Sequence, residues 1–161
     1  MARSRTSTST RSFSADDKGI FMNSTLVDKI SKNKLEEIRI SILKNNKIDV
    51  RIYFYFPNEP EPKPTKKGIW LSFKHIPKML KAFDELVQNP EKLVNVELEG
   101  NEKDQIKVYS AQYMGKNLIH IRQFYLKEGE FMPGRGVSFS SAALPQIIEG
   151  FKKAATYEGK I

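Results

Sequence analysis

The chain carries one pattern of residues twice, at a spacing of about 70 residues. In the first copy, residues 47–54 precede residues 64–69; in the second, residues 117–125 precede residues 133–137. Each copy begins with alternating apolar and polar residues, passes through a turn that contains glycine, and leads toward helical spacing. An internal repeat constrains the fold strongly because each copy forms one supersecondary unit. Two copies are too few for a solenoid, so we predict a pair of half-domains that pack against each other.

Segments that alternate between apolar and polar residues predict strands with one buried face. In the first copy the predicted strands are residues 20–30, which include a turn, and residues 38–42, 48–55 and 69–73. In the second copy they are residues 93–98, 106–113, 118–125 and 137–139. Apolar stripes at helical spacing follow, over residues 75–86 and 142–155. The prolines at positions 57, 60, 62 and 64 predict a loop without strand or helix, and Trp70 is predicted to be buried.

These segments predict an α+β protein of two tandem units, each with about four antiparallel strands followed by a C-terminal helix. We expect a disordered basic Ser/Thr/Arg tail over residues 1–18, a first ββββα repeat over residues 19–89 and a second over residues 90–161. A single unit of this size buries little surface by itself. The two units are therefore expected to pack as an intramolecular pseudo-dimer.

The composition predicts a polyanionic partner. The formal net charge is +8, which favours association with polyanions. Residues 1–35 carry seven basic and three acidic side chains, residues 36–89 ten and seven, and residues 90–161 ten and nine. The chain has no cysteine, which excludes disulfides and thiolate metal sites. The tail also resembles an organellar presequence, although its Thr-rich part offers no apolar helix face.

Residues 129–139, preceded by residues 119–125, resemble the single-stranded-DNA-binding domain of the positive cofactor 4 transcriptional coactivators. That family reads approximately I-D-I-R-E-Y-W, then an acidic loop, then P-G-R-K-G-I-S-L and a helix. The first copy matches through residues 48–54 and 64–72. The two matches together cover roughly residues 36–155. The resemblance implies a homodimer whose two sheets form a groove for unpaired strands, and we infer that a tandem chain builds this pair from one polypeptide.

The two copies depart from the family pattern in different ways. The second copy has one residue fewer before Gly136, so Lys67 has no strict counterpart there. The acid that the first copy keeps as Asp49 becomes His120 in the second. The family's tryptophan becomes a weaker aromatic platform, and its aromatic at the first hairpin tip is kept in the second copy only. We therefore expect the two halves to bind a strand unequally.

Unpaired nucleic acid is held by basic side chains that follow its backbone and by aromatic rings on which bases stack. The expected arrangement has Arg51 and Arg122 at solvent-facing strand positions beside aromatic residues, with lysines in the turns. The predicted nucleic-acid-binding residues are Arg39, Lys44, Lys47, Arg51, Tyr53, Phe54, Lys66, Lys67, Tyr113, Lys116, Arg122, Phe124, Tyr125 and Arg135.

The expected function is that of a single-stranded nucleic-acid binding protein, of DNA in the first place and RNA as an open alternative. We expect it to act as a transcriptional coactivator or regulator, or in genome maintenance, with transcription-machinery proteins as further partners. The nucleus is the expected location; a mitochondrion and a viral or bacterial cytoplasm stay open. No catalytic motif is present, so neither an enzyme, a cofactor nor a metal is expected. No apolar run approaches the roughly 18 residues that a membrane span needs, so no membrane is expected either.

Two further points stay open from the sequence. A tandem chain is either a monomer with an internal pseudo-dimer or a homodimer of such chains. The alternative function is a protein-interaction module that keeps the fold without binding nucleic acid. The nearly neutral charge of the second repeat is the argument for that alternative.

Overall fold

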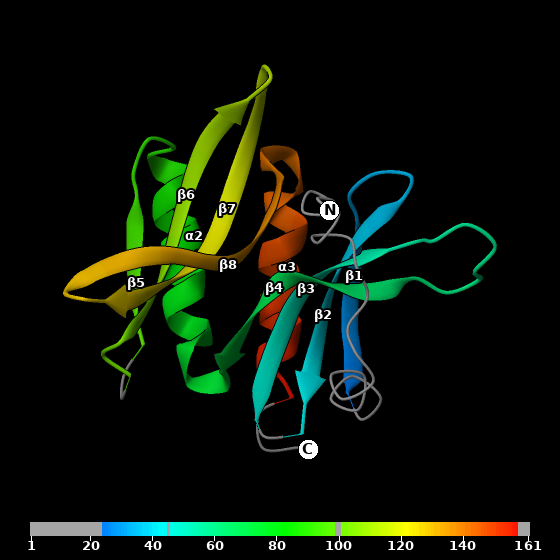
Figure 1. The fold of residues 1–161 in the computed structure, drawn as a ribbon, viewed down its shortest axis with the longest axis horizontal. Coiled ribbons are helices and arrows are strands. Elements are labelled where there is room, and N and C mark those ends of the chain that lie inside the picture. Colours follow the sequence, from blue (N-terminus) through cyan, green and yellow to red (C-terminus); the bar gives the residue numbers. More distant parts are fainter. Residues whose placement is uncertain (1–23, 45, 99–100, 158–161) are drawn as a thin grey trace.

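The computed structural model describes residues 24–44, 46–98 and 101–157, which form two four-stranded antiparallel sheets and two α-helices (Figure 1). The strand orders are β1-β2-β3-β4 and β5-β6-β7-β8. The first unit contains β1 (Thr25–Ser31), β2 (Glu36–Leu43), β3 (Lys47–Phe54), β4 (Lys63–Ser72), the 3-10 helix η2 (Phe73–His75) and α2 (Ile76–Gln88). The second contains β5 (Val94–Glu97), β6 (Asp104–Tyr113), β7 (Lys116–Lys127), β8 (Glu130–Ser140), the 3-10 helix η3 (Ser141–Ala143) and α3 (Leu144–Ala155). The predicted fold class is confirmed.

The two sheets share their register in detail. Arg51 pairs with Gly68 and Arg122 with Gly136, and the register shifts directly after each arginine. A bulge of this kind bends a strand and increases its twist. The same irregularity thus stands at the same place in both sheets.

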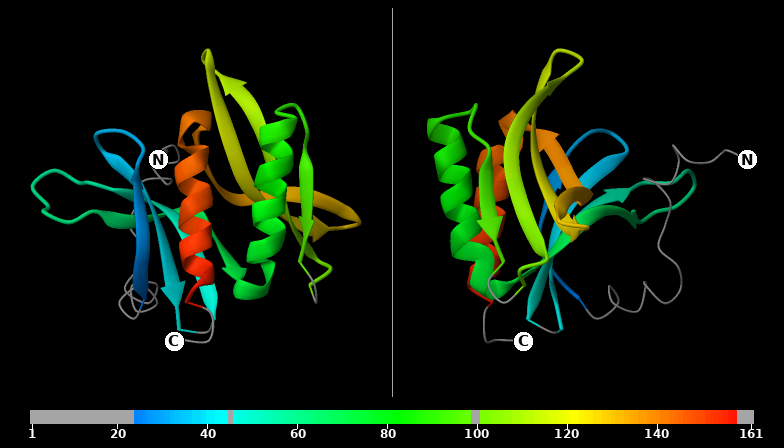
Figure 2. Two further views of the ribbon diagram at one scale, coloured as in Figure 1. Left: turned by 180° about the vertical axis from the view of Figure 1, so that it is seen from behind. Right: turned by 60° about the vertical axis from the view of Figure 1, so that its left-hand side comes forward.

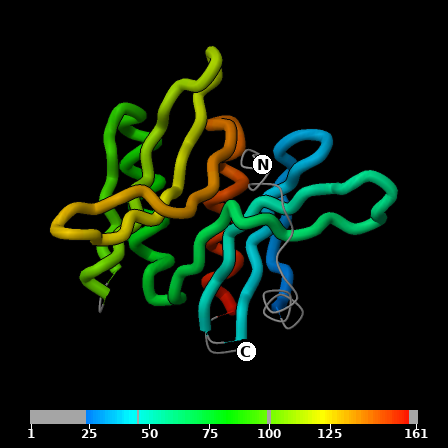
Figure 3. Tube along the Cα trace, in the orientation of Figure 1, coloured from blue at the N-terminus to red at the C-terminus, as the bar shows by residue number. Residues whose placement is uncertain are grey.

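The hairpins of the two units point in opposite directions (Figure 3). The β2–β3 turn lies at the bottom of the view and the β6–β7 turn at the top, while the β3–β4 and β7–β8 connections extend to opposite sides. In the second unit, Met114, Gly115, Glu128 and Gly129 all have positive φ. Two successive residues with positive φ form the tight turn whose twist matches that of a hairpin. These turns allow β6, β7 and β8 to continue as long strands.

The helices are exchanged between the units. Helix α2 of the first unit packs on β5 and β6, whereas α3 of the second unit packs on β1 and β2 (Figure 2). The helices also contact each other through Phe83 and Phe151, whose ring centroids are 5.2 Å apart. Gly150 allows the close approach of α3, because a Cβ there would lie 2.4 Å from the Cδ1 of Ile40. The buried apolar residues of both units therefore form one cluster.

Two expectations for the fourth strand are wrong. Strand β4 already begins at Lys63 and includes Pro64, and β8 includes Pro133. Proline is tolerated here because both strands lie at a sheet edge, where one row of backbone N–H groups has no strand partner. Trp70 is 40% exposed instead of buried, since strand alternation directs Ile69 and Leu71 into the core and the intervening ring away from it.

None of the helices in the described ranges is long and apolar enough to span a membrane.

Candidate nucleic-acid interface

Both helices lie on one side of the molecule, so each sheet has a face that points away from them (Figure 2). We call these the first outer face, formed by β1–β4, and the second outer face, formed by β5–β8. On the second, one cross-strand row is Lys107, Arg122 and Gly136. The equivalent row on the first is Arg39, Arg51 and Gly68. The two faces thus place cations at matching positions.

The strands β4 and β8 contact each other where the sheets meet, and a cleft of about 360 Å³ opens beside them. Lys66 and Lys67 of the first unit line it together with Arg122 and Arg135 of the second, and none of the lining residues within the described ranges carries a carboxylate. We call it the basic cleft. Four of the residues predicted from the sequence, two from each unit, therefore lie together.

Arg122 is held in place within the basic cleft. Its Nη1 donates a hydrogen bond to the carbonyl oxygen of Gly134 at 2.8 Å. A Cβ on Gly136 would lie 2.8 Å from the carbonyl oxygen of Ile121 and 3.0 Å from the Cα of Arg122. Glycine is therefore required where β8 passes the arginine, and the hydrogen bond to Gly134 fixes the position of the guanidinium.

Lys32, in the β1–β2 turn, is a further cation of the first unit and forms a salt bridge with Glu36 at 3.7 Å. Burial lowers the pKa of Lys32, and the charge of Lys67 lowers it further against the opposing effect of Glu36. Burial, Arg122 and Lys32 together lower the pKa of His120. These mutual effects place Lys32 within electrostatic range of both units' basic residues. The sequence did not predict Lys32 as a binding residue, because no sequence pattern shows that a turn of one unit lies close to basic residues of the other.

Partly buried rings lie beside the cleft on the second outer face. Tyr109 stacks on His120 with ring centroids 5.0 Å apart and an interplanar angle of 14°. The Nζ of Lys107 lies 5.0 Å from the ring centroid of Phe124. Of these residues the sequence predicted only Phe124, because the cross-strand pairing that brings the others beside it depends on register.

Arg51 is buried, so its predicted solvent-facing position is wrong. It is 1% exposed; its Nη2 donates to Asp49 at 2.8 Å and its Nη1 to the carbonyl oxygen of Thr65 at 2.9 Å. Burial raises the pKa of Asp49, while Arg51 and a hydrogen bond from Trp70 lower it. The charge of Arg51 is thus matched by a carboxylate inside the protein.

Arg39 and Tyr53, also on the first outer face, are paired internally as well. Tyr53 is buried, which raises its pKa to about 12, and the guanidinium carbon of Arg39 lies 4.8 Å from its ring centroid. Arg39 also forms a salt bridge with Glu37. The hydroxyl of Tyr55 donates to the same carboxylate at 2.9 Å. Neither Arg39 nor Tyr53 presents a free group of the kind predicted.

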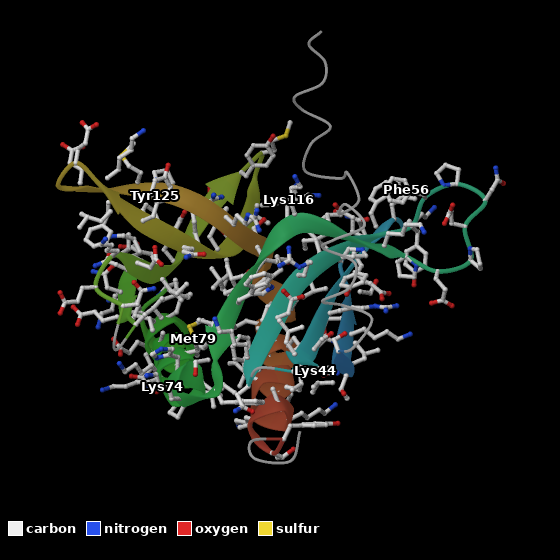
Figure 4. All side chains as sticks on the ribbon, turned by 60° about the horizontal axis from the view of Figure 1, so that its bottom comes forward. Lys44, Phe56, Lys74, Met79, Lys116 and Tyr125 are labelled. Atoms are coloured by element: carbon white, nitrogen blue, oxygen red, sulfur yellow. The ribbon has the colours of Figure 1, made fainter. Side chains whose placement is uncertain are left out.

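The remaining predicted residues do not line the basic cleft (Figure 4). Lys44 lies in the β2–β3 turn and Lys116 is the first residue of β7, at opposite ends of the molecule. Phe54 packs edge-on against Phe56, with centroids 4.8 Å apart. Tyr113 is an exposed end residue of β6, and Tyr125 pairs with Met132 across the β7–β8 hairpin.

A second pocket, of about 380 Å³, lies along the same seam. Lys47, Trp70 and Lys74 line it from the first unit, and Asp104 and Arg135 from the second. Arg135 thus lines both this pocket and the basic cleft.

The sequence model of the family described as Transcriptional Coactivator p15 (PC4) matches residues 101–150. No curated protein gives a significant match to the chain. The matched segment contains β6, β7, β8 and the first half of α3. It therefore includes Arg122, Arg135 and the rings of the second outer face. The second unit is thus similar to the Transcriptional Coactivator p15 (PC4) family over residues 101–150.

Proposed function

We propose that this protein binds single-stranded nucleic acid, in the first place DNA, through the basic cleft and the second outer face. The observation that carries the proposal is the meeting of Lys66, Lys67, Arg122 and Arg135 in one cleft, whose lining among the residues that the structure describes includes no carboxylate. Cations of this density attract the phosphates of a nucleic-acid backbone and release its counterions.

The aromatic rings beside the cleft provide surfaces for base stacking, which is the second requirement for binding an unpaired strand. Unpaired bases expose their faces and stack on aromatic side chains, at about 1–3 kcal/mol per base. Tyr109, His120 and Phe124 lie on the same face as Arg122. A strand whose phosphates enter the cleft then has rings within reach of its bases, whereas a duplex keeps its base faces covered.

The family description supports a role in transcription. We propose that the chain acts as a transcriptional coactivator or regulator in the nucleus, with genome maintenance as the other use of the same binding activity. Proteins of the transcription machinery are the proposed further partners.

Fluorescence anisotropy with labelled single-stranded DNA, duplex DNA and RNA of equal length, at several salt concentrations, tests the proposal. We expect tight, salt-sensitive binding with preference for single-stranded DNA. Replacing Lys66 and Lys67 together by Ala is expected to weaken binding. It is also expected to reduce the salt slope, which is the fall in the logarithm of the binding constant per unit of log salt concentration, by up to about 1.4. Each phosphate that is no longer neutralised lowers this slope by about 0.7.

The matched control removes two charges elsewhere. Lys152 and Lys153 lie on α3 and form only exposed salt bridges, which contribute little to stability. Their double replacement by Ala changes the net charge equally but is expected to leave the salt slope almost unchanged. Equal losses in the two double variants would show that net charge, and not the basic cleft, determines binding.

A further inference from the structure

Trp70 occupies the strand position that corresponds to Ser138 in the second unit, two residues after the glycine that pairs with the arginine. It lies in the cross-strand row of Ser41 and Asp49 on the first outer face. The equivalent row on the second outer face is Tyr109, His120 and Ser138. Large aromatic side chains lose favourable burial when they face water. An outward tryptophan, 40% exposed, at a position that a small polar residue fills in the other unit therefore indicates contact with a ligand.

Trp70 lies beside a buried ion pair. It is the cross-strand partner of Asp49, which accepts a hydrogen bond from Arg51 at 2.8 Å, and Arg51 also donates to the carbonyl oxygen of Thr65. Asp49 and Arg51 are buried, whereas Trp70 is 40% exposed. An aromatic ring that is accessible beside a fixed buried pair offers a flat surface to a flat partner.

The pocket at Trp70 differs in chemistry from the basic cleft. Besides Lys47, Lys74 and Arg135, it is lined by the amide of Asn101 and the carboxylate of Asp104. The Nδ2 of Asn101 donates to Asp104 at 2.8 Å, which leaves its second N–H and the other carboxylate oxygen to meet a base edge, whereas the cleft offers mainly cations. One aromatic ring, cations and polar groups that recognise a base edge together match a nucleotide.

We propose that Trp70 forms a nucleobase-binding subsite, in which one base of a single strand held by the basic cleft stacks on the indole. The proposal rests on the proposed single-strand binding function. Arg135 lines both the cleft and the Trp70 pocket, so the strand passes from one to the other across the seam of the two units. Because Ser138 gives the second unit no equivalent ring, the bound strand has different surroundings at its two ends.

The chain contains a single tryptophan and six tyrosines, so fluorescence excited selectively at the indole reports on this subsite alone. We expect single-stranded DNA to quench the fluorescence of the full-length protein along the same binding curve that anisotropy follows. An abasic strand of equal length keeps its phosphates but cannot stack. It is expected to bind more weakly and to leave the fluorescence largely unquenched.

Two variants complete the test. Trp70→Ser, which introduces the residue found at the equivalent position of the second unit, is expected to lower affinity about 5- to 150-fold with little change in salt slope. Trp70→Phe keeps a ring and is expected to restore most of the affinity. If anisotropy shows binding while the fluorescence stays constant and Trp70→Ser binds like the unmodified protein, the subsite is refuted and the proposed function stands. No binding to any single strand refutes both.

Discussion

The two outer faces contain the same arrangement around an arginine, but the arginine has a different role on each face. Arg51 and Arg122 each donate Nη1 to a carbonyl oxygen of the following strand, at 2.9 and 2.8 Å, and each lies opposite a glycine. The difference stands two residues earlier, where Asp49 forms an ion pair with Arg51 and His120 takes that place beside Arg122. The arginine is internally matched in the first unit, and it lines the basic cleft in the second. One substitution thus separates a structural arginine from one available to a ligand.

The largest effect is expected when the buried ion pair is broken. Asp49→Ala removes the carboxylate from a buried guanidinium, and loss of one partner of a buried pair costs about 3–5 kcal/mol. Urea denaturation followed by circular dichroism measures the change in the free energy of unfolding.

The matched variant in the second unit is His120→Ala, for which we expect a loss below about 1 kcal/mol. Similar losses for both variants would mean that Asp49 and His120 serve the same structural purpose, and the contrast between the two faces would fail.

Arg122 is expected to give the next largest effect, this time on binding. Arg122→Ala removes one cation from the basic cleft, and a hydrogen bond to a charged group contributes about 1.5–3 kcal/mol. We expect affinity for single-stranded DNA to fall about tenfold or more and the salt slope to decrease by about 0.7. Anisotropy titrations at several salt concentrations measure both. An unchanged slope would place the bound phosphates elsewhere on the molecule.

The net charge of each unit, counted along the sequence, did not predict the charge of the surface that the unit presents in the fold. Counted along the sequence, the second unit is nearly neutral, which favoured a protein-interaction module. In the fold, Lys66 and Lys67 of the first unit line a cleft on the second, and Lys32 acts on His120. Because Lys66 and Lys67 lie on β4, which contacts β8 where the sheets meet, only the packing of the units assigns these lysines to a surface.

Local patterns predicted the strands and helices better than the site. Alternation located β2, β3, β6 and β7 because each sheet has one apolar face. The exchange of α2 and α3 between the sheets left no trace in the sequence, since either sheet offers an apolar face to either helix. The solvent-facing position predicted for Arg51 was wrong for a related reason. Strand alternation shows that its side chain points away from the helices, but it does not show that the side chain is buried on the outer face. The pairing of Tyr109 with His120 depended on cross-strand register.

Tyr109 is expected to contribute less than Arg122. Tyr109→Ala removes one ring of the second outer face, and His120 already covers part of that ring, so we expect a loss near the lower end of about 1–3 kcal/mol per stacked base. The salt slope should stay the same because no charge is removed. On the first outer face, Tyr53→Phe changes a buried ring and should leave binding unaltered. A reduced slope in Tyr109→Ala would mean that the ring positions cations and does not stack on a base.

The smallest expected effect is a pH dependence that only the second outer face has. His120 is faced by Tyr109 from β6, by Arg122 from its own strand, by Ser138 from β8 and by Lys32 from the first unit, and burial with the two cations lowers its pKa below 6.5. The free protein therefore carries it neutral at pH 7. A bound phosphate favours the charged imidazole and raises that pKa again.

Binding of the nucleic-acid strand is therefore coupled to uptake of a proton by His120. The affinity for single-stranded DNA should rise a few-fold as the pH falls from 7 toward 5. Folding responds in the opposite direction: the unfolded chain takes up a proton near pH 6.5 before the folded protein does, so acid lowers stability. An oligothymidine strand, whose bases do not titrate in this range, isolates the protein's contribution in an anisotropy titration. His120→Gln should remove the pH dependence of binding, whereas a dependence that persists in this variant would have to come from a group outside the Tyr109–His120 pair.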